Sequence, residues 1–147
     1  YPSGGCLHSL EVYVIPSRCE GLAPGVYRYL AVEHSLERAG APGPALDLLL
    51  KEARQGTGGE LAVLPPVLMV FTARVRRVTR KYQSLAYSLI LKEVGALFQT
   101  MYLVATAMDL AACAIGTGDS ERFSRAAGLD FYTEASVGEL ILGGLAP

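Results

Sequence analysis

The sequence predicts an α+β fold, and three observations carry that prediction. Short apolar segments bounded by proline or glycine recur along the chain and are typical of strands. These segments outnumber the expected helices, and the two kinds of element do not alternate strictly, as they would in a doubly wound parallel sheet. The 147 residues are 51% hydrophobic without a break in composition, so a single domain over residues 1–147 is expected.

Two strands and a third extended segment are expected in the N-terminal part. Residues 10–15 are rich in valine, isoleucine and tyrosine, and Pro16 stops that strand. Pro24-Gly25 turns the chain into a second strand over residues 26–30. Residues 33–40 carry mixed polar side chains and form either another short strand or a turn.

A short helix and a further strand follow. Residues 45–54 hold four leucines among charged residues, and several glycines come after them, so the segment is expected to be a helix that ends in a loop. Pro65-Pro66 then precedes a strongly apolar strand over residues 67–72.

The longest expected element is a helix that starts near Val75 and runs through Leu110. Its apolar positions recur at helical spacing and form one stripe, made of Leu85, Leu89, Val94, Leu97, Met101, Val104 and Met108. We expect this segment to be the central helix of the fold, with a kink at Gly95.

The C-terminal part contains a loop, a short helix and a last strand. Residues 111–115 form a short strand or turn that enters Gly116-Thr117-Gly118. Asp119 or Ser120 caps a helix that runs to residue 127 and is ended by Gly128. Residues 137–142 close the domain as a strand.

Charge and hydropathy restrict the classes of partner. The net charge of −1 gives no global attraction to nucleic acid, and no nucleic-acid partner is expected. The longest apolar stretch, residues 94–108, is shorter than the roughly 20 residues of a membrane span, so it is interpreted as a buried helix and no membrane partner is expected. The mean hydropathy of +0.31 fits a chain that buries further surface in a dimer.

The cysteines bear on the cellular location of the protein, and the first residues bear on whether further sequence precedes the chain. Cys6, Cys19 and Cys113 cannot all pair within one chain, and no secretory signal is recognised, so reduced thiols and a cytoplasmic location are expected. The chain begins at Tyr1 without a methionine and enters directly on a motif. We therefore expect that further sequence precedes it in the protein.

Lys81-Tyr82 is the candidate catalytic pair. An amine beside a phenol can move a proton if a ligand is held nearby. The same residues also end a basic run of Arg74, Arg76, Arg77 and Arg80, and such a run is commonly a solvated face. Adjacent helical positions diverge by about 100°, so both side chains reach one pocket most easily if a helix begins here.

Two glycine-containing segments are candidate cofactor contacts, because glycine lets backbone approach a flat ring or a phosphate closely. The first is Pro2, Ser3, Gly4 and Gly5, and the second is Ile115, Gly116, Thr117 and Gly118. Each segment is equally readable as an ordinary turn. Cys6, His8 and Cys19 fit no zinc-ligand spacing and lack a fourth ligand, so no metal site is expected.

Several motifs, in order along the chain, resemble those of the nitroreductase-like FMN flavoproteins, and most closely the SagB-type azoline dehydrogenase branch. The segments that carry the resemblance are Tyr1-Pro2-Ser3-Gly4-Gly5, Leu10-Glu11-Val12-Tyr13, Gly25-Val26-Tyr27-Arg28-Tyr29, Lys81-Tyr82 with Tyr87, Glu93-Val94-Gly95 with Gln99, Cys113-Ala114-Ile115-Gly116 and Glu134-Ala135-Ser136-Val137-Gly138-Glu139. The order of several motifs is far more specific than any one of them.

The resemblance implies an antiparallel-rich central sheet flanked by helices, a long central helix, a homodimer and bound FMN. The family uses a Lys-Tyr pair at the position of Lys81 and Tyr82 to oxidise a thiazoline or oxazoline to the azole. One of the pair would remove a proton from carbon, the other would orient or tune it, and hydride would pass to the flavin. A lysine serves as a base where burial or a neighbouring cation lowers its pKa.

The resemblance also implies roles for the glycine-containing segments. The segment that matches Ser3 to Gly5 contacts the flavin across the dimer interface, and the loop that matches Ile115 to Gly118 lies along the flavin ring. The partners implied are a heterocycle-bearing peptide and a cyclodehydratase complex. Glu134 and Ser136 match the family pattern without an assigned role.

The sequence departs from the family pattern at several points. Residues 1–147 contain no segment resembling Arg-x-Ser-x-Arg, which grips the flavin phosphate in the family. His8 and Ser9 stand where the family has Tyr-Pro, Leu85 and Ser88 replace arginines around Tyr87, and Asp109 and Ala111 replace glycines.

These departures leave three interpretations open. The chain is an azoline dehydrogenase, a degenerate non-catalytic partner in a biosynthetic complex, or a general nitro or quinone reductase. The identity of the substrate and the choice between thiazoline and oxazoline are left open, as is FMN binding without the missing segment.

Overall fold

The computed structural model describes residues 1–144. Its centre is a six-stranded sheet in the order β3-β2-β1-β4-β6-β5, in which all neighbouring strands are antiparallel. The strands are β1 (Leu10–Pro16), β2 (Val26–Leu30), β3 (Ser35–Gly40), β4 (Val67–Ala73), β5 (Leu110–Ile115) and β6 (Ala135–Gly144). The expected α+β class and antiparallel sheet are confirmed.

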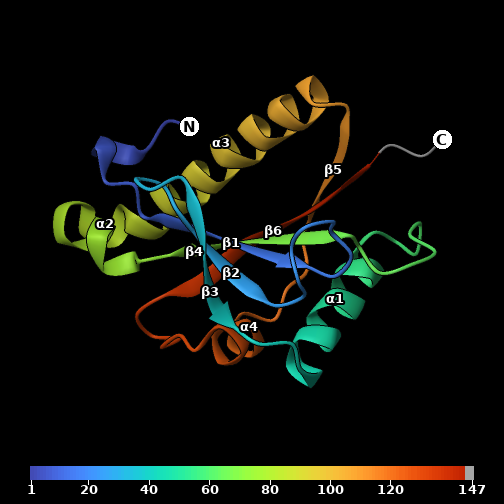
Figure 1. Cartoon of the computed structure of the whole chain (residues 1–147). Helices are drawn as coiled ribbons and strands as arrows, with labels where there is room; N and C mark the ends of the chain where they lie inside the picture. The colour runs from blue at the N-terminus through green and yellow to red at the C-terminus, as the bar shows by residue number, and fades with distance from the viewer. Residues whose placement is uncertain (145–147) are drawn as a thin grey trace.

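Helices cover both faces of the sheet (Figure 1). Helices α1 (Pro44–Gly56) and α4 (Ser120–Ala127) lie on one face, and α2 (Val75–Tyr82) and α3 (Ala86–Ala107) lie on the other. Short 3-10 turns, Gly4–Cys6 and Gln83–Leu85, precede β1 and α3. The long α3 is the central helix that the sequence predicts.

The sheet separates two apolar cores because successive strand residues point to opposite faces. Leu68 and Val70 on β4 pack toward α1 and α4, where Phe123 is 1% exposed. Phe71 and Ala73 on the same strand pack toward α2 and α3, where Ile90 is fully buried. β4 is central and buried on both sides, which explains its uninterrupted apolar sequence.

The strand predictions are confirmed with small shifts at the ends. β1 includes Pro16, β2 has the expected bounds, and β4 and β6 extend beyond the predicted residues 67–72 and 137–142. The two segments left open between strand and turn are the edge strands β3 and β5.

The predicted helix from Val75 to Leu110 is wrong in continuity. The chain breaks at Gln83, which adopts a left-handed φ of 47°, and a 3-10 turn separates α2 from α3. Gly95 lies inside α3, and α3 runs without interruption past it to Ala107. Asp109 has a φ of 54° and turns the chain, so that Leu110 is already the first residue of β5.

The segment Val75–Ala107 is long and apolar enough to span a membrane by length and composition. The expectation based on residues 94–108 alone therefore understated its apolar length. A core helix meets the same criterion, and here Ile90, Val94 and Leu97 of α3 pack on the sheet. The opposite side of α3 is solvent-exposed and mixed in character, with Tyr87, Leu91 and Leu103 exposed beside Ser88, Lys92 and Gln99.

The boundaries of α4 follow the predicted capping residues. The Asp119 side chain accepts a hydrogen bond from the Arg122 backbone N–H at 2.8 Å, so Asp119 and not Ser120 is the N-cap. Gly128 ends the helix in the left-handed conformation, with a φ of 68°, which glycine adopts without steric cost.

Candidate functional site

The N-terminal turn and the end of α2 form the candidate site. Figure 1 shows the N-terminal segment beside α2 and α3. Gly5 has a left-handed φ of 60°, and a Cβ added there would lie 2.6 Å from the Tyr82 hydroxyl oxygen and 2.9 Å from Lys81 Nζ. Only a residue without a side chain fits against this pair. The structure therefore brings together two candidate segments that are far apart in the sequence.

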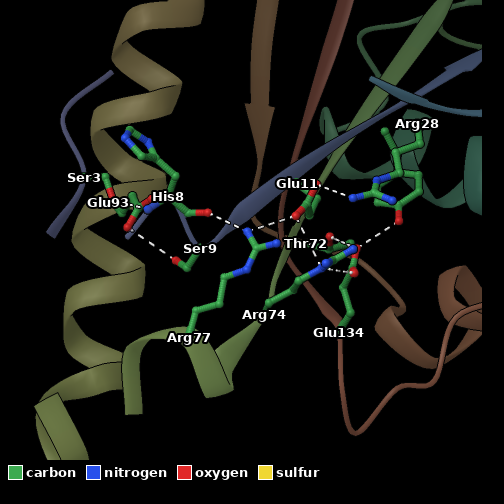
Figure 2. Close-up of polar contacts among 11 residues, drawn as sticks. Ser3, His8, Ser9, Glu11, Arg28, Thr72, Arg74, Arg77, Glu93 and Glu134 are labelled. Atoms are coloured by element: carbon green, nitrogen blue, oxygen red, sulfur yellow. Dashed lines mark hydrogen bonds and ion pairs between the residues drawn. The ribbon is translucent and has the colours of Figure 1, made fainter. Parts of the chain in front are cut away.

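The turn that carries Gly5 is held in a strained conformation. Cys6 and His8 also have left-handed φ angles, 57° and 44°, and each such non-glycine residue costs about 1–3 kcal/mol. The Ser3 hydroxyl accepts the His8 backbone N–H at 2.9 Å, and Arg77 donates to the His8 carbonyl at 2.8 Å (Figure 2). The Ser3 contact holds the turn from within, and the Arg77 contact holds it to α2.

Lys81 and Tyr82 end α2 rather than begin a helix. The pair therefore stands at a helix end instead of the helix start that would most easily direct both side chains to one pocket, and the chain leaves the helix at Gln83. Lys81 is exposed and its Nζ lies 5.3 Å from the centre of the Tyr82 ring, within the range of a cation–π contact. Tyr82 is half-buried and packs on the core beneath α3. The phenol is thus fixed by packing, whereas the amine is free to reach a ligand.

The loop Ile115 to Gly118 lies on the other side of the sheet. Ile115 packs in the core with α1 and α4, and Gly118 lies directly against the Glu139 carboxylate. A Cβ added to Gly116 would meet nothing within 4 Å, so the backbone there faces open space. Within one chain this loop does not join Gly5, Lys81 and Tyr82.

The residues present fit a flavin as two half-sites. The first offers the Lys81 ammonium and the Tyr82 hydroxyl beside glycine backbone, a donor set suited to the carbonyl and nitrogen acceptors of a flavin ring. The second offers the open backbone at Gly116. The half-sites lie on opposite sides of the sheet, so one chain does not bring them together.

Glu139 is a partly buried carboxyl beside the second half-site. Burial raises the pKa of Glu139 above its ordinary value, and a hydrogen bond from the Ser136 hydroxyl opposes this shift only in part. The folded state therefore favours the protonated carboxyl. The stability contributed by this preference is present below the ordinary pKa of 4.5 and is lost as pH rises through the raised pKa.

We therefore expect Glu139→Gln to increase the free energy of unfolding at pH 7. Glutamine keeps the shape and the hydrogen bond with Ser136 while removing the buried charge. Urea unfolding of both proteins at pH 4 and pH 7 measures this effect. The variant should gain stability relative to the parent at pH 7 and gain less at pH 4; an equal effect at both values would show that charge is not the cause.

Glu134 is the centre of a buried polar network that the sequence did not explain. Its carboxylate accepts hydrogen bonds from the Tyr13 hydroxyl at 2.9 Å, the Thr72 hydroxyl at 2.6 Å and Arg74 Nε at 2.8 Å. Figure 2 shows Thr72 and Arg74 converging on Glu134. Thr72 follows Val70 by two residues on β4, so strand alternation places it on the same face of the sheet as Val70 and Tyr13.

The pKa values of the network follow from these contacts. Burial disfavours the ionised form of Glu134 most strongly, but the hydrogen bonds from Thr72, Tyr13 and Arg74 together outweigh it and hold the pKa below the ordinary value. Burial and the hydrogen bond to Glu134 raise the pKa of Tyr13. Glu134 is thus an anion and Tyr13 a neutral donor at physiological pH.

A second carboxylate links this network to the N-terminal turn. Glu11 pairs with Arg28 at 2.8 Å, with Arg77 at 3.1 Å and with Arg74 at 3.3 Å. Arg77 also holds the His8 carbonyl, so the chain of contacts runs from Glu134 to the strained turn (Figure 2). The sequence signal was the position of Glu11 and Glu134 in the resembling motifs, but neither motif states which side chains meet.

Ser9 and Glu93 make a smaller buried contact on the α3 side of the same turn. The Ser9 hydroxyl donates to Glu93 Oε2 at 3.3 Å, and Glu93 is 5% exposed. Among residues 1–144, Glu93 Oε1 has no hydrogen-bond partner. This contact joins α3 to the residue that precedes β1.

The described residues contain no metal-binding group. Within residues 1–144, no three histidine, cysteine, aspartate or glutamate side chains are grouped to hold a metal ion. Cys6, Cys19 and Cys113 are exposed free thiols.

Comparisons with known proteins agree with this fold. The model of the nitroreductase family matches residues 1–144. The protein MJ1384 of Methanocaldococcus jannaschii, whose name assigns it to the nitroreductases, is 30% identical over 115 residues, which cover 78% of this chain and 56% of that protein.

Two solved structures are similar over nearly the whole chain. One is a chain of the E. coli microcin synthetase McbBCD complex with truncated pro-MccB17 bound, with a TM-score of 0.82 and 25% identity over all of this chain and 56% of that one. The other is a protein of Anabaena variabilis described as a nitroreductase, with a TM-score of 0.81 and 26% identity over 96% of this chain and 28% of that one.

These relatives are longer proteins. The matched residues span 56% of MJ1384 and 56% of the chain from the microcin synthetase complex. The family model nevertheless covers almost every residue of the sequence, including the N-terminal turn, the Lys81-Tyr82 pair and the loop Ile115 to Gly118. The chain therefore belongs to the nitroreductase family.

Proposed function

We propose that this chain is part of an FMN-dependent oxidoreductase that dehydrogenates thiazoline or oxazoline rings in peptides. The observation that carries the proposal is the contact of Gly5 with both Lys81 and Tyr82. In this arrangement a ligand laid against the glycine backbone meets an amine and a phenol at once. A general nitro reductase needs no such pair, because nitro reduction removes no proton from carbon.

The chain's own residues would bind the ring system and move the proton. Oxidation of an azoline to the azole removes one proton and one hydride from carbon. FMN supplies the hydride acceptor when it is bound. Lys81 Nζ or the Tyr82 oxygen takes the proton, and the other holds the first by a hydrogen bond or by charge. The half-buried Tyr82 and the strained turn keep the reacting groups in place without reorganisation.

The similarity to a chain of a peptide-modifying synthetase supports a peptide substrate. The related structure holds truncated pro-MccB17, and we extend a substrate of that kind to this chain. We also propose assembly with a cyclodehydratase, which would make the azoline, and the similarity to a chain of a synthetase complex supports this partner. Oxidation is then the step that consumes the product of ring closure.

We further propose that the complete site forms in a homodimer packed through α3. The outer side of α3 exposes Tyr87, Leu91 and Leu103. Gly95 lies among them, and a Cβ added there would meet nothing within 4 Å. Glycine inside a helix costs about 1 kcal/mol relative to alanine, a cost that close approach of a second helix would offset.

The double variant Leu91→Glu/Leu103→Glu tests this dimer. Four charges on one face would oppose burial of that face between two copies. Light scattering coupled to gel filtration should give the mass of a dimer for the parent and of a monomer for the variant. Leu48→Glu on α1, at an equally exposed leucine, should leave the dimer intact. A monomeric parent protein would overturn the proposal.

The visible absorption spectrum of the purified protein tests the function, with mass identification of any compound released on denaturation. About one FMN per chain is expected, bleached by a thiazoline-bearing peptide without added reductant. A protein that binds no FMN, even when FMN is added, would favour a non-catalytic member of a complex. A protein that binds FMN but oxidises no azoline, while reducing nitro compounds, would favour the general reductase.

A further inference from the structure

Helix α2 carries an excess of positive charge on its exposed side. Its eight residues, Val75–Tyr82, contain Arg76, Arg77, Arg80 and Lys81 and no acidic residue. Residues four apart are neighbours on a helix, so Arg76 lies beside Arg80 and Arg77 lies beside Lys81. Like charges at this spacing destabilise a helix.

The described part of the chain relieves only part of this repulsion. Arg77 pairs with Glu11 at 3.1 Å. Within residues 1–144, no carboxylate forms an ion pair with Arg76, Arg80 or Lys81. The like charges of Arg76, Arg80 and Lys81 therefore destabilise α2, and the ion pairs among residues 1–144 do not offset this repulsion.

One further carboxylate faces this surface. The pKa of Asp130 lies below its ordinary value because the Thr133 hydroxyl and the Tyr132 backbone N–H donate to it, with a smaller contribution from the charge of Arg76. Asp130 is therefore occupied by its own loop. Glu11 is shared among Arg28, Arg74 and Arg77, so neither carboxylate pairs with Arg76, Arg80 or Lys81.

The α2 surface is continuous with the candidate site, because Lys81 belongs to both. α2 rises about 12 Å over its eight residues, the length of about four residues of extended peptide. A peptide chain that presents its ring to Gly5 and Tyr82 would continue over this surface. The charge of α2 would then select the residues beside the ring.

We propose that Arg76, Arg80 and Lys81 form a docking surface for an acidic segment of the peptide substrate. The inference rests on the function proposed above and adds the chemical class of the residues that flank the ring. Carboxylates of such a segment would receive charge-assisted hydrogen bonds from the two guanidinium groups. A peptide is favoured over nucleic acid because the surface is short and the whole chain carries a net charge of −1.

Peptide binding can be measured without turnover. The probe is a fluorescein-labelled octapeptide with four consecutive glutamates, and its partner probe has glutamines in their place. Fluorescence anisotropy at 50 mM salt should give tighter binding of the glutamate peptide, and the difference should shrink at 300 mM salt. Arg76→Gln/Arg80→Gln should weaken binding of the glutamate peptide by about tenfold, the effect of losing two ion pairs at an exposed site.

The matched control is Lys51→Gln/Arg54→Gln, which removes two exposed cations from α1 on the opposite face of the sheet. It should leave binding of the glutamate peptide within twofold of the parent. Equal binding of both peptides, or equal loss in both double variants, would overturn the proposal. Tighter binding of an eight-nucleotide single strand than of the glutamate peptide would also overturn it.

FMN absorbance of the same samples separates this inference from the proposed function. Arg76→Gln/Arg80→Gln should keep the FMN content of the parent, and a loss of FMN would overturn the docking surface by assigning these cations to the cofactor. Binding of the glutamate peptide by a protein without FMN would uphold the surface while the proposed function fails. Bound FMN and azoline oxidation without a preference for the glutamate peptide would uphold the proposed function and overturn the docking surface.

Discussion

Glu134→Ala is expected to lower the free energy of unfolding by about 2–5 kcal/mol, mainly because each buried hydroxyl left without its acceptor costs about 1–3 kcal/mol. The Glu134 side chain is 6% exposed, and its removal leaves the Tyr13 and Thr72 hydroxyls without their acceptor in the core. A domain of this size has about 5–15 kcal/mol in total. Urea unfolding followed by circular dichroism measures the loss.

Glu121→Ala is the matched control for this prediction. Glu121 pairs with Arg125 on the outside of α4, where the two side chains are 69% and 65% exposed, and its removal should cost no more than about 0.5 kcal/mol. Glu134→Gln should fall between the two variants, because its amide oxygen still accepts a hydrogen bond while its charge is gone. A loss below 1 kcal/mol for Glu134→Ala would contradict the central place of the network.

The same carboxylate makes stability depend on pH. Because the folded-state pKa of Glu134 lies below the ordinary value of 4.5, its contribution is complete above pH 4.5 and is lost as pH falls through the lowered pKa. The parent should therefore lose more stability than Glu134→Gln between pH 5 and pH 2. This direction is opposite to that expected for Glu139, so the two glutamates can be told apart by pH alone.

The strands were predictable because their signals are local. β2 is bounded by Pro24-Gly25, and β4 follows Pro65-Pro66 and is apolar on both faces. The break between α2 and α3 gave no such signal, because Gln83 is neither glycine nor proline and its φ of 47° is imposed by the packing of the two helices. Gly95 gave a false signal, since glycine is tolerated inside a helix whose neighbours are fixed by packing.

The sequence predicted which residues belong to the candidate site but not how those residues lie relative to one another. Resemblance to family motifs selected Gly5, Lys81 and Tyr82, and only the folded chain shows that they touch. The contacts of Glu134 join side chains from β1, β4 and the residue after β4, 60 to 121 residues away in the sequence, and no short sequence pattern specifies such contacts. The separation of Ile115 to Gly118 from Gly5 follows from sheet order, and that order is set by pairings between distant segments.

Lys81→Met and Tyr82→Phe are both expected to lower kcat for azoline oxidation. The variant that removes the proton acceptor should lose about 10²- to 10⁴-fold, the usual contribution of a positioned acid or base. The other variant should lose less and should show most of its effect in kcat rather than in KM, since neither substitution removes apolar contact with the ring. Each variant removes one donor of the first half-site, so FMN content is measured for both and kcat is expressed per bound FMN. Tyr82→Phe keeps the packing beneath α3.

Two controls make the result specific. Lys51→Met on α1 and Tyr132→Phe, at a tyrosine that is 89% exposed, repeat the same chemical changes away from Gly5 and should leave kcat within twofold. Full turnover in both Lys81→Met and Tyr82→Phe would sink the proton-transfer assignment even if FMN is bound. A deeper loss for Tyr82→Phe would assign the proton to the phenol, which the core holds in place, and would leave Lys81 as the exposed cation that stabilises the phenolate beside Gly5.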